Sequence, residues 1–324
     1  MSVLNNLVVG KELIGTVAVK SATARKTKAG KDYLSLELFD GTETVQANYW
    51  DWKSGKVPSA NSVIDFKAAV TEWAGSKQLT ILKMSLNTDV PVESFAPKST
   101  YDVDQIYRNC YALASGIQDD YLAALCINIL EALMNKWQTV PGALSIHHAY
   151  LGGTLIHSYS VARIAESIAL KVPGANADLC VAGALLHDVG KLYTYKLDKA
   201  TICMTDDGRL FDHIFMGAEF VDNFSDNIEI AKSPADEHKL KLLKHIILSH
   251  HGELEFGSPV TPLCIEALIV HHADAVDAAC EAIRAASLKA GEHMWTDRIW
   301  SLGNKCCLTT HYVDSIMKPG TVEE

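Results

Sequence analysis

The sequence predicts an α+β chain in two parts, a small five-stranded β-barrel followed by an all-α domain. Three observations predict this division. The spacing of apolar residues changes from a period of two to a period of 3.6 near residue 100, and the charge balance changes at the same place. With 324 residues, 48% of them hydrophobic and 21% charged, the chain has an ordinary globular composition and length enough for about two domains of 100–200 residues each.

The first 86 residues contain five short segments that are typical of strands. They alternate apolar and polar side chains or are rich in β-formers, and they cover residues 12–21, 32–40, 43–52, 62–73 and 77–84. Turn residues separate them, including Asp40-Gly41 and Gly75-Ser76. Five short strands in under 90 residues favour a closed barrel of the OB type, with a fragment of a strand-rich sandwich as the alternative.

Beyond a proline-containing polar stretch, apolar residues recur at the helical spacing. The clearest helical segments are residues 121–137, 154–170, 177–192, 239–251 and 262–286. We predict an OB-type domain over 1–86, a linker over 87–100, a helical connector over 101–136, a second helical domain over 137–290, and a tail of unknown role over 291–324.

The net charge of −10 averages two different regions. Residues 1–100 carry 12 basic and 10 acidic side chains, whereas residues 101–324 carry 17 basic and 29 acidic ones. The acidity therefore belongs to the second region, and the whole-chain value does not exclude a nucleic-acid partner for the first.

No window approaches the ~18 consecutive apolar residues of a membrane span, and the N-terminus lacks the pattern of a signal peptide. The eight cysteines include no CxxC pair and mostly lie in apolar contexts, which favours buried free thiols in a reducing compartment. We therefore expect a cytoplasmic protein with no membrane partner; a homo-oligomer is left open.

An adjacent histidine and aspartate carry the sharpest chemical signal. His187 and Asp188 end the apolar run Cys180–Leu186 and are followed at once by Val189-Gly190-Lys191. Polar groups at the inner end of a buried helix need partners, and a divalent metal would satisfy both side chains. A His-Asp pair alone is weak, because isolated helical histidines are more often hydrogen-bonded core or surface groups.

Further histidines and an aspartate flank this pair, and the order along the chain is His157, His187-Asp188, His213, His250-His251 and Asp274. This order resembles that of the HD superfamily of metal-dependent phosphohydrolases. The resemblance implies that a first metal ion binds to His157, His187, Asp188 and Asp274. It implies a second ion at His213 and at His250 or, alternatively, His251, with the Asp188 carboxylate bridging the two ions. Mixed imidazole and carboxylate ligands suit Mn²⁺ first, with Fe²⁺, Zn²⁺, Co²⁺ or Mg²⁺ as alternatives.

Longer motifs resemble the YhaM-type 3′-5′ exoribonucleases. They are HHAYLGGTLIH (147–157), LLHDVGK (185–191), LSHHG (248–252) and GSPVTPLCIEALIVHHADAVDA (257–278). The family combines an OB-type barrel with an HD domain, so the resemblance covers most of the chain. Thr154, Val189 and His272 depart from its pattern, and none of them is an expected ligand.

The resemblance implies further roles for residues around these ligands. Two ions about 3.5–4 Å apart would activate a hydroxide for attack on phosphorus. Lys191 would be the nearest cation for a phosphate oxygen, or else a lysine that meets a helix dipole. Substrate contacts or support of the ligands are expected from His147, His148, His251 and Asp277; His238, His293 and His311 are assigned to surface or packing.

The barrel contains an acid-free basic segment, residues 20–31, which we interpret as the loop between the first two strands. Together with nearby aromatic residues it forms a candidate surface for single-stranded nucleic acid, made of Lys20, Arg25, Lys26, Lys28, Lys31, Tyr33 and Trp50. A solvated loop and core-filling aromatic residues are the alternative.

The sequence thus predicts a metal-dependent 3′-5′ exonuclease that hydrolyses single-stranded RNA, with DNA left open, to nucleoside 5′-monophosphates. A first alternative is an HD-type nucleotidase or cyclic-nucleotide phosphodiesterase that acts on a small substrate. A second is a nucleic-acid-binding adaptor whose HD domain is inactive.

Overall fold

A computed structural model describes residues 3–5, 7–53, 55–144, 148–227 and 233–317. Within these ranges the chain forms two compact units. The first comprises residues 1–98 together with 197–203, and the second comprises residues 99–196 together with 204–324. None of the described helices is both long and apolar enough to cross a lipid bilayer.

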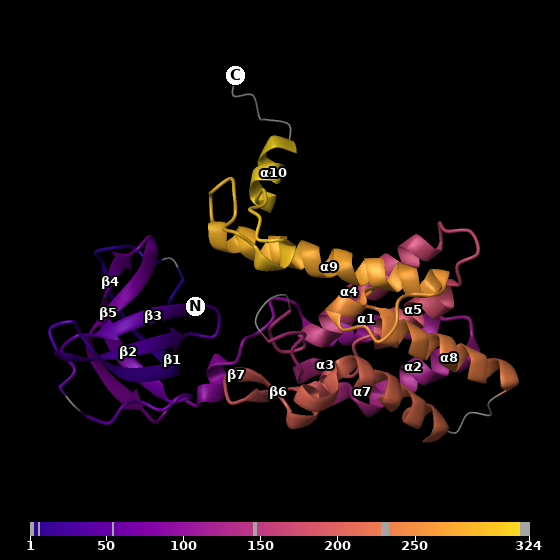
Figure 1. Ribbon diagram of the computed structural model, residues 1–324, viewed down its shortest axis with the longest axis horizontal. Coiled ribbons are helices and arrows are strands. Elements are labelled where there is room, and N and C mark those ends of the chain that lie inside the picture. The colour runs from indigo at the N-terminus through magenta and orange to yellow at the C-terminus, as the bar shows by residue number, and fades with distance from the viewer. Residues whose placement is uncertain (1–2, 6, 54, 145–147, 228–232, 318–324) are drawn as a thin grey trace. The chain divides into compact units, whose positions relative to one another are not determined.

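The first unit is a closed five-stranded β-barrel, drawn in indigo and purple in Figure 1. Its strands are β1 (Glu12–Lys26), β2 (Asp32–Phe39), β3 (Thr44–Tyr49), β4 (Val63–Trp73) and β5 (Ser76–Asn87). Their order around the barrel is β1-β2-β3-β5-β4; β1 pairs with both β2 and β4, and β3 and β5 pair in parallel. This is the OB topology, so the predicted barrel is confirmed and the sandwich alternative is wrong.

Alternation of side chains explains how so small a barrel holds together. Every second residue of β2 points inward, and Leu34, Leu36 and Leu38 are almost completely buried. Inward residues of the other strands fill the same core, among them Val17, Val19, Ile64, Phe66, Val70 and Leu79. Because side chains alternate between the two faces of each strand, the apolar residue at every second position fills the barrel core.

The basic segment 20–31 is only partly a loop, which corrects our prediction. Strand β1 continues to Lys26, and its residues 21–26 pair with residues 32–37 of β2. The connecting turn is limited to residues 27–31, where Gly30 has a positive φ. Lys20, Arg25 and Lys26 thus lie on a strand. The sequence did not indicate the outer part of this strand, because that stretch is polar and shows no apolar alternation.

The second unit contains the helices and one small hairpin. Its helices are α1 (Val103–Gly116), α2 (Asp120–Ala132), α3 (Met134–Thr139), α4 (Gly153–Ala169), α5 (Ala177–Leu186), α6 (Lys191–Thr194), α7 (Asp206–Asn227), α8 (Pro234–Ser249), α9 (Ile265–Ala290) and α10 (Thr310–Met317). Short 3₁₀ turns lie at Leu254–Phe256 and Trp300–Leu302, and a third at Val92–Phe95 belongs to the first unit.

Helix α5 is the centre of the helical core. All of its residues from Leu179 to Leu186 are buried, as expected for a helix that is apolar on every side. Asn176 begins the helix by accepting a hydrogen bond from the Leu179 backbone N–H. Helices α4, α8 and α9 pack around it, and Figure 1 shows α9 running past α4 and α5.

The prediction of an exclusively helical second region is wrong at one place. Strands β6 (Tyr195–Asp198) and β7 (Thr201–Met204) form a two-stranded hairpin between α6 and α7. The tip of this hairpin belongs to the barrel unit, where Ala200 packs with Ala18, Val63 and Val92. Four-residue strands are too short to produce a recognisable period in the sequence.

Candidate metal centre

The His-Asp pair lies where helix α5 ends inside the protein. His187 is the residue that terminates α5, and the His187 and Asp188 side chains are almost completely shielded from solvent. The Nδ1 atom of His187 donates to the backbone carbonyl of Ala184 at 2.7 Å, which leaves Nε2 directed away from the helix. A buried carboxylate and a buried imidazole are therefore presented together at one helix end.

Helices α4 and α9 bring two further predicted ligands to the same point. The Nε2 atom of His157 lies 3.2 Å from Nε2 of His187 and 3.1 Å from Oδ1 of Asp274. Two imidazole nitrogens at this distance compete for one proton or share one cation. His157 and Asp274, which lie far apart in the chain, thus converge beside the His-Asp pair.

The two oxygens of Asp188 face different histidines. Oδ2 lies 3.3 Å from Nε2 of His187 and 3.5 Å from Nε2 of His157. Oδ1 instead lies 3.5 Å from Nε2 of His213 and 3.7 Å from Nε2 of His250. Each oxygen of Asp188 therefore has its own pair of histidines.

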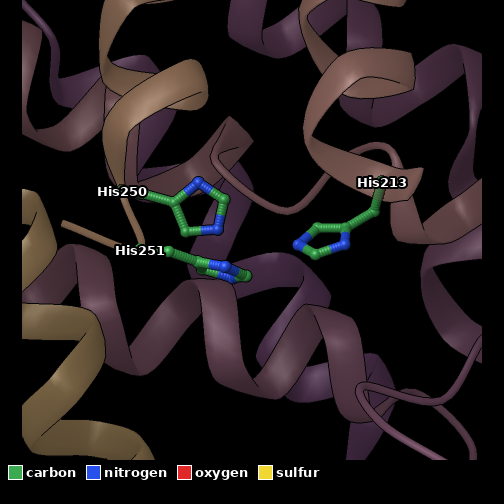
Figure 2. Close-up of side chains that lie close together, drawn as sticks. All are labelled: His213, His250 and His251. Carbon is green, nitrogen blue, oxygen red and sulfur yellow. The ribbon is translucent and has the colours of Figure 1, made fainter. Parts of the chain in front are cut away.

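A cluster of three histidines forms the Oδ1 side. Figure 2 shows the ring of His213, from α7, facing the rings of His250 and His251, which follow α8; the ring centroids of His250 and His251 lie 5.7 and 5.2 Å from that of His213. Their ring nitrogens come within 4.8 Å of one another. The structure therefore brings both His250 and His251 close enough for a cation bound by His213.

Three buried atoms at this point have no hydrogen-bond partner in the described part of the chain. They are Oδ1 of Asp188, Nε2 of His213 and Nε2 of His250. Leaving a polar atom buried and unpaired costs about 1–3 kcal/mol, so three of them around one spot need a common explanation. A divalent ion would supply it, because all three atoms can donate a lone pair.

Backbone carbonyls fix the orientation of the remaining imidazoles. Nδ1 of His250 donates to the Ile247 carbonyl at 2.7 Å, and Nδ1 of His251 donates to the Phe256 carbonyl at 2.8 Å. In each ring the Nε2 atom is then left to accept a proton or bind a metal. The tautomers therefore suit metal ligation before any ion binds.

Glycines in the motifs allow the elements of the centre to approach closely. A Cβ atom on Gly190 would lie 2.0 Å from the carbonyl oxygen of His213, and one on Gly153 would lie 2.0 Å from the carbonyl oxygen of His148. Gly252 has a φ of +82°, and a Cβ there would meet the ring of His271. These glycines are required by packing of backbone against the centre.

Burial and neighbouring charged groups shift the pKa values of the side chains in the centre. Burial lowers the pKa of His157, but its hydrogen bonds to Asp274 and Asp277 outweigh burial and raise the pKa to about 10. Burial raises the pKa of Asp188, yet the neighbouring Lys191 and His187 hold it well below its usual range. Burial keeps the pKa of His250 well below its usual range, so this imidazole is neutral and its lone pair is available.

Lys191 lies at the centre but is already paired. Its Nζ atom is 2.6 Å from Oδ2 of Asp188, and its side chain is 12% exposed. Lys191 is also the first residue of the four-residue helix α6, so the ion pair with Asp188 explains its position better than a helix dipole does.

Asp277 and His148 lie behind His157 and do not face Asp188. Oδ2 of Asp277 accepts from Nδ1 of His157 at 2.7 Å and is 2.9 Å from Nε2 of His148. Nδ1 of His148 is in turn 2.8 Å from the hydroxyl of Tyr150. His147 lies outside the described residues.

Sequence reasoning missed two residues that contact the predicted ligands, Tyr150 and Asp212. Tyr150 lies inside the HHAYLGG motif, two positions after His148, and contacts its ring. The Asp212 carboxylate accepts from the backbone N–H of His213 at 2.5 Å and contacts Nδ1 of the same ring. The adjacent Asp212-His213 pair offered the same signal as the His-Asp pair of α5.

The predicted nucleic-acid residues lie on the barrel surface. Arg25 pairs with Tyr33 across β1 and β2, and Tyr33 stacks on Trp50 with ring centroids 4.6 Å apart. Lys26 and Lys31 form exposed ion pairs with Asp32 and Asp51. The remaining two candidates are Lys20, whose Nζ atom contacts Thr44 and the Phe39 ring, and Lys28, which lies in the turn.

These helices and this cluster define a class of domain. Residues 154–279 match the family described as "HD domain", and they form a helical HD domain whose clustered histidines and aspartates make a candidate divalent metal site. The barrel and this domain together are the OB-plus-HD arrangement that the sequence predicted.

The particular relatives are exoribonucleases. The chain is 26% identical over 302 residues to a protein named 3′-5′ exoribonuclease YhaM from Oceanobacillus iheyensis, an alignment that covers 92% of this chain and 93% of the relative. It is 27% identical to the protein of the same name from Listeria monocytogenes serotype 4b, with 92% and 95% covered. The predicted resemblance to YhaM-type proteins is confirmed.

Among solved structures, the second OB-fold domain of replication protein A from Methanococcus maripaludis aligns with 27% of this chain and 94% of its own length. The sequence identity is 12% and the TM-score is 0.21.

Proposed function

We propose that this protein is a metal-dependent 3′-5′ exoribonuclease, a hydrolase that removes nucleoside 5′-monophosphates from single-stranded RNA. One observation carries the proposal: buried, unpaired donor atoms from α7, from the residue after α8 and from the His-Asp pair converge on one point. The names of the relatives support the choice of RNA and of the 3′ end.

We propose two cation positions, one on each side of the Asp188 carboxylate. His157, His187, Asp274 and Oδ2 of Asp188 would hold one ion. His213, His250 and Oδ1 of Asp188 would hold the second ion, and His251 lies near enough to supply a third imidazole ligand. This mixed donor set suits Mn²⁺, Fe²⁺, Co²⁺ or Zn²⁺ better than Mg²⁺, and we propose Mn²⁺.

When bound, such ions lower the pKa of a coordinated water and neutralise charge on a phosphate. The chain's own contribution is to hold the ligands rigidly and to exclude water from behind them. Lys191 adds a fixed positive charge beside Asp188, and we propose that it contacts a non-bridging oxygen of the terminal phosphate. His148 and Asp277 act through His157 and not on the substrate.

We propose that the barrel holds the RNA strand upstream of the cleaved bond. Arg25 lies opposite Tyr33 in the register of β1 and β2, Tyr33 stacks on Trp50, and Trp50 is 39% exposed. Base stacking on such rings contributes about 1–3 kcal/mol per base. DNA binding, a homo-oligomer and a cytoplasmic location remain predictions from the sequence.

The test is degradation of a single-stranded RNA labelled at its 5′ end. With Mn²⁺ we expect a ladder of shortened, still-labelled products, and with a chelator we expect intact RNA. Intact RNA in Mn²⁺ with rapid hydrolysis of free nucleotides or cyclic nucleotides would favour the small-substrate alternative. Binding of RNA without any hydrolysis would favour the adaptor.

A further inference from the structure

We propose that each of the two cation positions depends on one positioning carboxylate, Asp277 for the ion at His157 and Asp212 for the ion at His213. Neither carboxylate faces the ions directly. Each contacts Nδ1 of its histidine, the atom opposite the nitrogen that faces Asp188. The inference rests on the proposed metal centre and assigns it two supporting residues that control the ions separately.

The His157 side is a buried hydrogen-bonded chain. It runs from the Tyr150 hydroxyl through the ring of His148 to Oδ2 of Asp277 and then to Nδ1 of His157, with successive distances of 2.8, 2.9 and 2.7 Å. Both Asp277 and His148 are buried. With Nδ1 of His157 committed to this chain, Nε2 is the only ring nitrogen left to face Asp188 and Asp274.

The His213 side is built differently but ends at the same atom. Asp212 interrupts α7 with φ 61° and ψ 161°, a backbone region that costs a residue other than glycine about 1–3 kcal/mol. This conformation places the Asp212 carboxylate on both the backbone N–H and the ring Nδ1 of His213. Nε2 of His213 is thereby turned toward Oδ1 of Asp188.

The other three imidazoles of the centre differ, because neutral carbonyls hold their Nδ1 atoms. The carbonyls belong to Ala184, Ile247 and Phe256. A carboxylate partner makes an imidazole a stronger metal ligand than a carbonyl does, and removal of such a partner weakens metal binding by about 10–100-fold. Each ion position therefore contains one strengthened histidine.

The experiment counts Mn²⁺ ions bound to the full chain by equilibrium dialysis and measures the dissociation constant of each. We expect two ions on the unmodified protein. Asp277→Asn and Asp212→Asn should each weaken a different one of the two ions by about 10–100-fold, and the double variant should weaken both. Asp222→Asn is the matched control, since Asp222 also lies on α7 but pairs with Lys244.

A milder variant protects the test against misfolding of the buried site. Tyr150→Phe removes only the outermost hydrogen bond of the chain and should weaken the His157 ion by less than about tenfold, with an unchanged melting temperature in chelator. Tyr111→Phe is its control, because the Tyr111 hydroxyl makes its hydrogen bond with Glu131, on the surface of α1 and α2. Asp212 is 63% exposed, so its replacement leaves the core intact.

Three results with the variants would overturn the inference. Two ions bound with unchanged affinity by both aspartate variants would show that the carboxylates do not position the ligands. Loss of the same ion in both variants would contradict their separate roles. A third ion that is lost in Asp277→Asn would mean that His148, His157 and Asp277 bind metal themselves. If the unmodified protein binds no Mn²⁺, the proposed metal centre fails as well.

Discussion

The candidate metal centre and the barrel surface differ in the burial of their charged and polar side chains, and therefore in how strongly each indicates a ligand. At the centre, side chains of α4, α7 and α9 meet those of the residues that follow α5 and α8. Several of their atoms have no partner other than one another within the described part of the chain. On the barrel, the basic side chains are exposed, and two of them pair with neighbouring carboxylates. Buried polar atoms need a bound partner because water cannot reach them, whereas an exposed cation is solvated with or without a ligand.

The largest expected effect comes from removing the shared carboxylate. Asp188→Ala takes away an oxygen from both proposed ion positions, so we expect hydrolysis to fall at least about 1,000-fold, which corresponds to about 4 kcal/mol of transition-state stabilisation. Metal analysis should show loss of both ions. The control Asp120→Ala alters an exposed residue at the start of α2 and should change neither value. Retained hydrolysis in Asp188→Ala would show that the centre is not catalytic.

The second effect is on the pH dependence of stability in the absence of metal. The pKa of His157 is raised from 6.5 to about 10, so its proton stabilises the folded state fully below pH 6.5, and this stabilisation is lost as the pH rises toward 10. The pKa values of Asp274 and Asp277 are lowered, so their stabilisation is present above about pH 4 and is lost in acid.

Urea unfolding of chelator-treated protein between about pH 4 and pH 10 measures this dependence. We expect stability to decline from pH 6.5 upward, and we expect Mn²⁺ to reduce the decline because the ion replaces the proton on His157. The decline should be smaller in His157→Asn. An equal decline in that variant would assign the titration to other groups.

A third prediction concerns the close packing beside the His-Asp pair. Gly190→Ala places a methyl group 2.0 Å from the His213 carbonyl, which must separate α7 from the centre. Overpacking of this kind lowers the free energy of unfolding by about 1–3 kcal/mol. We expect the variant to lose activity under conditions in which it is still folded. Gly116→Ala is matched, since nothing in the described part of the chain lies within 4 Å of a Cβ there. Equal tolerance of both changes in a urea titration would contradict the packing account.

The smallest effect is expected on the barrel. Lys26→Ala with Lys28→Ala should weaken RNA binding about tenfold at low salt and reduce the slope of log affinity against log salt by about 0.7 for each phosphate that a lysine no longer neutralises. Hydrolysis of a small chromogenic phosphodiester should be unchanged. A fall in both activities together would mean that these lysines are structural.

The sequence was sufficient to predict the helices and strands in which a hydrophobic pattern continues over several residues. Helix α5 was predictable because it is apolar on every side, and the barrel strands because their inward residues alternate. The outer half of β1 was not, since its residues 21–26 are held by pairing with β2 and not by burial. The β6–β7 hairpin was missed because each strand has only four residues.

At the centre, the residues were predictable but their roles were not. The resemblance to the HD superfamily brought His157, His187, Asp188 and Asp274 together in the prediction, and the structure places their side chains close to one another. The resemblance left open which of His250 and His251 joins His213, and the structure brings both rings near it. The adjacent Asp212 and His213 were visible as a pair in the sequence, but the non-helical backbone at Asp212, on which its proposed positioning role depends, was not.

The central claim is that the helical centre hydrolyses the terminal phosphodiester of RNA from the 3′ end. The most direct measurement is mass spectrometry of the mononucleotides that Mn²⁺-loaded protein releases from single-stranded RNA in ¹⁸O-labelled water. We expect nucleoside 5′-monophosphates with one ¹⁸O atom in each phosphate, released in order from the 3′ end. Nucleoside 3′-phosphates, release from the 5′ end, or full activity in Asp188→Ala would contradict it.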